Sequence, residues 1–209
     1  MEETFLIITE IIGTIAFAIS GIRLAAAKSF DWFGAYTVGL VTAIGGGTVR
    51  DLLLGATPFW MVNGWYLGVT GLALVIVILL KRYLVKLNKT FFVFDTIGLA
   101  LFVVIGIQKT LEFGFPMWTA IVMGTITGAL GGVLRDILIN EEPLVFRKDV
   151  YATACIAGGI VYWGILLGGG SSVLQQSTCA ASVIIIRLLA AKYNWSIPIL
   201  RDYADDNKQ

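Results

Sequence analysis

The chain has 209 residues, of which 57 % are hydrophobic and 14 % are charged, and its net charge is +1. A soluble domain averages about 45–50 % apolar and about 25 % charged residues, so this composition excludes a single water-soluble core and indicates an integral membrane protein. The near-neutral charge gives no reason to expect nucleic acid as a partner. The sequence contains no histidine, which removes the usual zinc ligand and the commonest general base.

Seven apolar stretches are long enough to be predicted as membrane-spanning helices, which need about 20 mostly apolar residues each. They fall at about 5–27, 32–54, 60–80, 91–108, 116–139, 150–168 and 172–190. The first stretch lacks the basic leader of a signal peptide, so we expect it to be retained. We therefore predict an all-α transmembrane domain over residues 1–193, followed by a polar C-terminal tail over 194–209.

Lysine and arginine gather on one side of these predicted spans. Lys28, the basic segment 81–89, Arg147 and Lys148 share that side with the C-terminal tail, whereas the loops of the other side carry Lys109. Because basic loops stay in the cytoplasm, we predict an inner (plasma) membrane protein with its N-terminus outside and its C-terminus inside. Segment 81–89 can also contact anionic membrane lipids, although its role in setting topology explains it sufficiently.

The sequence repeats itself with an offset of 85 residues. The segment from Gly45 to Asp51 recurs from Leu130 to Asp136, so that Arg50-Asp51 matches Arg135-Asp136. The same offset pairs Gly13 with Gly98, Gly21 with Gly106, Gly39 with Gly124, Thr42 with Thr127, Pro58 with Pro143, Tyr66 with Tyr151 and Glu10 with Asp95. We predict two three-helix repeats, over about 5–84 and 90–169, with a seventh helix over about 172–190. Because three crossings are an odd number, the second repeat is expected to be inverted relative to the first.

Each copy of the motif places glycines in the middle helix of its repeat. Gly45, Gly46 and Gly47 weaken the second helix, and Gly131 and Gly132 weaken the fifth, since glycine costs about 1 kcal/mol relative to alanine in a helix. A break there would expose carbonyl oxygens that suit a cation. Alternatively, the glycines let two helices pack closely. Both interpretations are open at this point.

The charged residues of the motif are the sharper signal, because a charge within a membrane normally faces a cavity or a partner. Adjacent helical residues point about 100° apart, so we expect Arg50 and Asp51 to find partners elsewhere, for example in the other repeat, and Arg135 and Asp136 likewise. They form either a structural ion pair between repeats or part of an ion pathway. Thr48 belongs to the same predicted pathway, with Glu10, Thr42, Asp95 and Thr127 as accessory polar groups. Arg23 and Arg187 are interpreted as helix-end residues that reach toward water.

Soluble-enzyme motifs are absent from the sequence: the glycines precede no P-loop lysine and there is no Gly-x-Ser-x-Gly segment. Cys155 and Cys179 lie in apolar runs and are interpreted as buried hydrophobic residues. We expect no enzyme activity, no cofactor and no tight metal site.

The duplicated three-helix unit, with its two glycine and Arg-Asp motifs and an added seventh helix, resembles the prokaryotic trimeric intracellular cation (TRIC) channels over about residues 5–190. The same bacterial domain family is also labelled a glycine transporter. The resemblance implies a homotrimer in which each subunit holds a pore for monovalent cations such as K⁺ and Na⁺, lined by kinked helices two and five. Leu130 replaces the first glycine of the second motif, which implies a milder kink there. The lysine-containing lipid-binding motif of animal members is replaced by Gly47-Thr48-Val49, so lipid dependence is not implied.

Three functions remain after this comparison. A cation channel is the leading hypothesis, and a secondary transporter of a small zwitterion such as glycine is the alternative, because inverted repeats and broken helices fit both. A membrane scaffold would leave the charges within the spans without a role.

Overall fold

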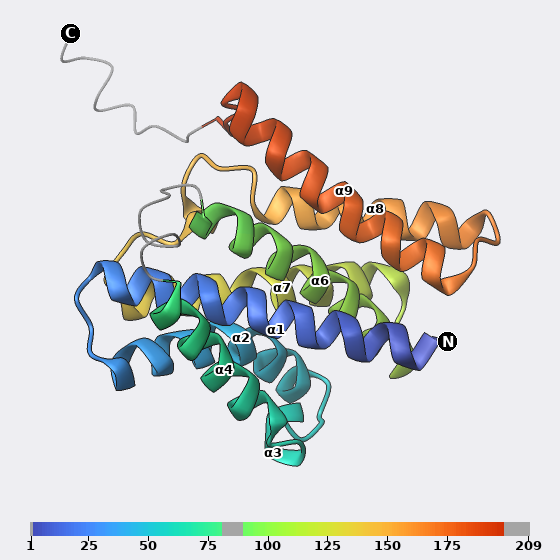
Figure 1. The fold of residues 1–209 in the computed structure, drawn as a ribbon. Helices are drawn as coiled ribbons and strands as arrows, with labels where there is room; N and C mark the ends of the chain where they lie inside the picture. The colour runs from blue at the N-terminus through green and yellow to red at the C-terminus, as the bar shows by residue number, and fades with distance from the viewer. Residues whose placement is uncertain (1, 81–89, 199–209) are drawn as a thin grey trace, which may run out of the picture.

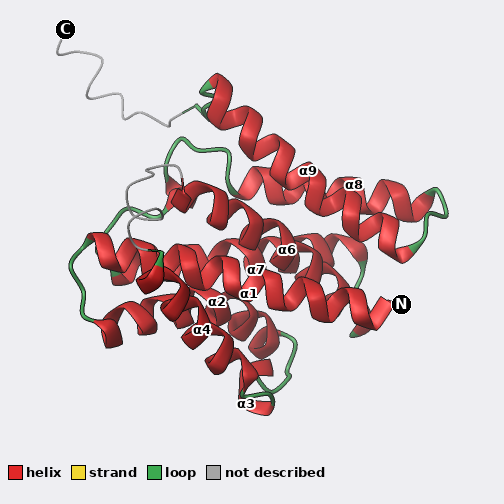
Figure 2. Ribbon diagram, in the orientation of Figure 1, coloured by secondary structure: helices red, strands yellow, loops and turns green. Residues whose placement is uncertain are grey.

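The computed structural model describes residues 2–80 and 90–198, and these residues are helical, with turns and loops between the helices and no strand among them (Figure 2). The predicted basic segment 81–89 and residues 199–209 of the tail lie outside this part. The helices are α1 (Glu2–Ala27), α2 (Trp32–Leu53), α3 (Phe59–Val62), α4 (Trp65–Leu79), α6 (Thr90–Glu112), α7 (Met117–Leu138), the 3₁₀ turn η1 (Leu144–Phe146), α8 (Ala152–Leu167) and α9 (Ser172–Tyr193).

Four of the described helices, α1, α6, α7 and α9, are long and apolar enough to cross a membrane. Two further apolar helices, α4 and α8, are shorter. The prediction of one continuous helix over 60–80 is wrong, because the chain divides there into α3 and α4. Asn63 and Gly64 separate the two, and Gly64 precedes the first residue of α4.

The repeat in the sequence is also a repeat in the structure. The bounds of α2 and α7 differ by 85 residues at both ends, and α3 and η1 begin 85 residues apart, at Phe59 and Leu144. The turns between helices match as well. Ser29 and its repeat partner Gly114 both have positive φ, at 62° and 79°. A left-handed residue is a common way to end a helix, so both repeats leave their first helix in the same manner.

Helices α1, α2, α6 and α7 form the centre of the fold, where α1 packs on α2 and α6, and α7 packs on the same two helices (Figure 1). Helix α4 lies against α1 and α2, whereas α8 and α9 pack together beside α7 and α6. The buried rings of Phe17 on α1 and Phe102 on α6 are repeat partners, and their centroids are 5.2 Å apart. The two repeats therefore meet at one shared apolar core.

Candidate ion pathway

The two glycine motifs meet where α2 crosses α7. A Cβ atom added to Gly46 would collide with the carbonyl oxygen of Thr127, and one added to Gly131 would collide with the carbonyl oxygen of Thr42. Each repeat thus presents its glycine to a backbone carbonyl of the other. Close approach of two backbones is the purpose that small residues serve between membrane helices.

The neighbouring glycines face side chains rather than open space. Gly45 faces Leu134, Gly47 faces the ring of Phe59, and Gly132 faces the hydroxyl of Tyr151. Both α2 and α7 are helical without interruption through their motifs. Of the two interpretations left open by the sequence, the helix break is therefore wrong, because the helix crossing uses the glycines as contact points without freeing their backbone.

The arginine and aspartate of each motif pair with each other. Arg50 Nε donates to Asp51 Oδ1 over 2.8 Å, and Arg135 Nε donates to Asp136 Oδ1 over the same distance. The expectation that adjacent residues could not neutralise each other is wrong, because the long arginine side chain bends to reach its neighbour. The expectation of a partner in the other repeat is confirmed for Asp51, which also pairs with Lys109 at 2.9 Å. All four residues are buried.

Each aspartate also secures the turn that follows its helix. Asp51 Oδ2 accepts a hydrogen bond of 2.9 Å from the backbone N–H of Phe59, and Asp136 Oδ2 accepts one of 3.2 Å from that of Leu144. These two acceptors and two donors are repeat partners. The Arg-Asp motif therefore closes the helix and fixes the start of α3 or η1, a role that residue spacing alone does not predict.

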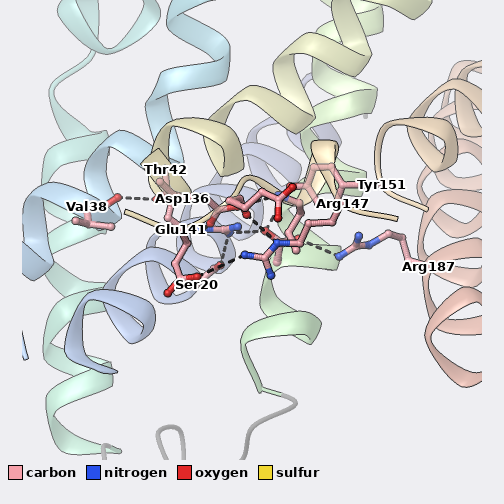
Figure 3. Close-up of polar contacts among 12 residues, drawn as sticks. Ser20, Val38, Thr42, Asp136, Glu141, Arg147, Tyr151 and Arg187 are labelled. Atoms are coloured by element: carbon pink, nitrogen blue, oxygen red, sulfur yellow. Dashed lines mark hydrogen bonds and ion pairs between the residues drawn. The ribbon is translucent and has the colours of Figure 1, made fainter. Parts of the chain in front are cut away.

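Asp95 on α6 is the centre of a buried ion cluster. Figure 3 shows the polar contacts of this region, with Ser20, Tyr151 and Arg187 labelled. Its Oδ1 accepts from Arg135 Nη1 over 2.5 Å and from the Tyr151 hydroxyl over 3.4 Å, and its Oδ2 accepts from Arg187 Nη2 over 3.1 Å. Arg135 Nη1 also donates to Ser20 of α1 over 2.9 Å, which links the two repeats.

Arg187 reaches this cluster from α9, the helix outside the repeat (Figure 3). The expectation that it lies at a helix end and reaches water is wrong, since its side chain is 3 % exposed. Arg23 is also buried. The buried partner of Arg187 could not be read from the sequence, because nothing in the repeat predicts where α9 docks.

Glu10 on α1 is the repeat partner of Asp95, and its surroundings are simpler. Its carboxylate accepts a hydrogen bond of 2.9 Å from the hydroxyl of Tyr66, as Asp95 accepts one from Tyr151. The Lys109 ammonium pairs with Asp51 Oδ1 at 2.9 Å. The matching of Tyr66 with Tyr151 at the common offset was the signal for this pairing.

The threonines of the predicted pathway bond to their own helices. Thr42 and Thr127 donate to the carbonyls of Val38 and Met123 over 2.6 Å each, and Thr48 donates to that of Ile44 over 2.7 Å. Thr48 also accepts from the indole N–H of Trp60 over 3.0 Å. Thr42 and Thr127 thus lie at the α2–α7 crossing, beside Gly131 and Gly46.

Two cavities lie near opposite ends of α1. We name them the Arg23 cavity and the Glu10 cavity. The Arg23 cavity has a volume of about 440 Å³ and is lined by Arg23, Leu24, Ala27, Lys28, Phe91, Asp136, Ile139, Glu141, Leu144 and Arg147. The Glu10 cavity has a volume of about 80 Å³ and is lined by Leu6, Glu10, Ile105, Gln108, Lys109 and Glu112.

The two cavities are related by the sequence repeat. Leu6, Gln108, Lys109 and Glu112 of the Glu10 cavity are the repeat partners of Phe91, Arg23, Leu24 and Ala27 of the Arg23 cavity. Glu10 and Arg23 are thirteen positions apart on α1, which is about 20 Å along a helix that rises 1.5 Å per residue. Phe17 lies midway between them, in the shared core.

Comparison with known proteins gives the same two-part division. A family model described as "Glycine transporter" matches the chain twice, over residues 7–82 and 92–166. A UPF0126 membrane protein of Vibrio cholerae is 42 % identical over 200 residues, which cover 95 % of this chain and 84 % of that protein. The UPF0126 inner membrane protein YadS of Escherichia coli K12 is 44 % identical over 155 residues, covering 73 % of this chain and 75 % of YadS.

Solved structures show the same fold. The TRIC trimeric intracellular cation channel orthologue from Rhodobacter sphaeroides superposes with a TM-score of 0.87 and is 30 % identical, covering 91 % of this chain and 99 % of that chain. A prokaryotic TRIC channel crystallised in 0.5 M KCl gives a TM-score of 0.85 at 30 % identity, over 92 % of this chain and 98 % of the other. The all-helical membrane fold and the resemblance drawn from the motifs are thereby confirmed. The chain is a membrane protein of the family whose model is described as "Glycine transporter", together with the UPF0126 membrane proteins, and it has the fold of the prokaryotic TRIC channels.

Proposed function

We propose that this protein is a channel for monovalent cations such as K⁺ and Na⁺, with a path in each subunit that joins the Glu10 cavity to the Arg23 cavity. The observation that carries this proposal is the pair of repeat-related cavities, both lined by charged groups, in a chain with the TRIC fold. Charged side chains within a membrane are costly and mark ion pathways, so their concentration around these two cavities favours transport over a scaffold.

The proposed topology follows the sequence. Residues 1–193 would form seven crossings, with repeats at about 5–84 and 90–169 in inverted orientation and a seventh helix at about 172–190. The Glu10 cavity would face outside and the Arg23 cavity the cytoplasm, in the inner membrane, and three subunits would assemble. Residues 194–209 would form a polar tail on the cytoplasmic side.

The path would pass beside α2 and α7, close to the motif residues Gly45 to Asp51 and Gly131 to Asp136. The buried rings of Phe17 and Phe102 lie between the two cavities. So does the crossing of α2 and α7, where Gly46 contacts Thr127. A hydrophobic constriction can stop ions by excluding water. We therefore place the narrow part of the path at the two phenylalanines, and conduction requires their rings to move apart.

Shortening the central side chains tests this location. Phe17→Leu and Phe102→Leu should increase K⁺ flux into liposomes, because each removes ring atoms from the constriction. Phe33→Leu is the matched control, since Phe33 on α2 is 79 % exposed. Equal flux in all three variants and the parent protein, with folding intact, would place the path elsewhere.

The alternative function is a carrier for a small zwitterion such as glycine, and the family model's description favours it. A carrier needs an occluded site at the midplane and alternating access, whereas a channel needs a continuous wet path. Counterflow of labelled glycine in the same liposomes separates the two, because a carrier exchanges glycine across a sealed membrane and the proposed channel does not.

A further inference from the structure

The two cavities have diverged in charge although they are repeat partners. The Glu10 cavity carries two carboxylates, Glu10 and Glu112, and one cation, Lys109. The Arg23 cavity carries three cations, Arg23, Lys28 and Arg147, and two carboxylates, Asp136 and Glu141. The charged residues that line the Glu10 cavity therefore sum to a negative charge, and those that line the Arg23 cavity sum to a positive one.

Ion pairing directs the one cation of the Glu10 cavity toward a group outside it. The Lys109 ammonium lies 2.9 Å from Asp51 Oδ1, a buried carboxylate that also pairs with Arg50. Glu112 is exposed, and Glu10 accepts its hydrogen bond from a neutral tyrosine. Both carboxylates of this cavity are thus available to a cation in solution.

The carboxylates of the Arg23 cavity are instead already engaged. Asp136 accepts from Arg135 and from the backbone of Leu144, and Glu141 pairs with Lys28 and with Arg147. Asp95, the partner of Glu10, lies buried between Arg135 and Arg187 and lines neither cavity. The repeat has therefore kept an accessible carboxylate at one end and neutralised it at the other.

We propose that this charge difference makes the channel rectify, so that cations enter more readily from the Glu10 cavity than from the Arg23 cavity, with Glu112 and Arg147 as the residues that set the difference. The proposal rests on the proposed channel function. A negative mouth raises the local concentration of cations and a positive mouth lowers it. A single charge at a mouth changes the current from that end by about two- to threefold when screening is weak.

Charge replacement at Glu112 provides the test. Glu112→Cys is recorded in planar bilayers as single channels, and Cys155 and Cys179 are buried, so the new thiol is the exposed one among the described residues. The variant should rectify less than the parent protein. An anionic methanethiosulfonate added to the chamber that the Glu10 cavity faces should restore the asymmetry, and a cationic one should weaken it further. The reagent acts from one chamber, so it also identifies the orientation of each channel.

Arg147→Gln tests the other end, and it should reduce the asymmetry by increasing the current that enters from the Arg23 cavity. Glu142→Gln is the control, because Glu142 is exposed but lines neither cavity. The asymmetry should fade as the salt rises from about 0.1 M to about 1 M, where the screening length falls from roughly 10 Å to roughly 3 Å.

Two results would overturn the proposed rectification: unitary cation currents that are equal in both directions at low salt, or currents that do not change with the charge on residue 112. Neither result would contradict the proposed channel function. The lack of unitary currents in every variant and in the parent protein would instead overturn the proposed function, and the inference with it.

Discussion

Gly46 lies directly against the backbone carbonyl of Thr127, on the helix that carries the second copy of its own motif. Its repeat partner Gly131 lies in the same way against Thr42. The crossing of α2 and α7 therefore contains two equivalent contacts, each between a glycine and the carbonyl of a threonine. A side chain at either glycine must push the two helices apart.

Gly46→Ala and Gly131→Ala should therefore destabilise the protein by about 1–3 kcal/mol, the usual cost of overpacking, and lower its thermal unfolding temperature in detergent. The sequence left a helix break and close packing both open, and these contacts favour close packing. Gly68→Ala is the control, because Gly68 lies on α4 with nothing within 4 Å of an added Cβ. It should gain up to about 1 kcal/mol of helix propensity. Normal stability with reduced flux in Gly46→Ala would contradict this and would show that the glycines serve as kinks in the helix.

The buried position of Arg187 predicts a second stability effect. Arg187→Met removes one of the two cations that neutralise Asp95 and should destabilise the protein by about 3–5 kcal/mol, because breaking a buried pair leaves an uncompensated charge. Lys192→Met on the same helix is exposed and should change stability by less than about 0.5 kcal/mol.

The double variant Asp95→Asn with Arg187→Met separates charge from packing. If Arg187 acts through Asp95, the double variant should lose less than the two single variants together, because the uncompensated carboxylate is then gone. Strict additivity of the two losses, measured by thermal unfolding, would show that Arg187 stabilises α9 independently of Asp95.

Orientation in the membrane is predicted by the distribution of basic residues. Cysteines at Glu112 and Glu142, both exposed, should respond differently to an impermeant thiol reagent in intact cells. Glu112→Cys should react from outside, and Glu142→Cys should react only after the membrane is opened. The unsubstituted protein is the control, since both of its cysteines are buried. The reverse pattern would invert the proposed topology.

The ion pairs of Glu141 predict a pH-dependent contact between two loops. A hydrogen bond from Lys28 and the nearby charges of Lys28 and Arg147 hold the pKa of Glu141 below its ordinary value of 4.5. Because the pKa is lowered in the folded state, the pairing is complete above the ordinary value and is lost as the pH falls through the lowered one. Spin labels at Phe30→Cys and Phe146→Cys should therefore give a narrow distance distribution at pH near 7 that broadens in acid.

Glu141→Gln should give the broad distribution already at neutral pH and lose the dependence on acid. Glu142→Gln should behave as the parent protein does. A narrow distribution in Glu141→Gln would mean that the backbone, and not the ion pairs, holds the two loops together.

Much of the fold can be predicted from the sequence, because the length of each apolar stretch indicates a helix and the repeated glycines indicate the two repeats. The predicted stretch at 32–54 became α2 over Trp32–Leu53, and that at 172–190 became α9 over Ser172–Tyr193. The division of 60–80 was missed, because Asn63 and Gly64 interrupt an otherwise apolar stretch too briefly to change its average. The pairing of Glu10 with Asp95 by offset was followed by equivalent tyrosine contacts in the structure.

The candidate site was harder to predict, because the partners of its charged residues depend on side-chain length and on how distant helices pack. Arg50 reaches back to Asp51 although their Cα–Cβ bonds diverge, which residue spacing alone does not reveal. Arg187 finds Asp95 because α9 packs on α6, and that contact joins residues 92 positions apart. The charge difference between the cavities depends on which residues line each one, and that is set by the packing of several helices.

The proposed channel differs from a carrier in one property: cations cross the membrane through it without alternating access. Recording single channels from the purified protein in planar bilayers with K⁺ as the main cation tests it most directly. We expect discrete current steps carried by K⁺ and Na⁺, with glycine neither required nor transported. Saturable glycine counterflow from the same preparation, without current steps, would contradict it.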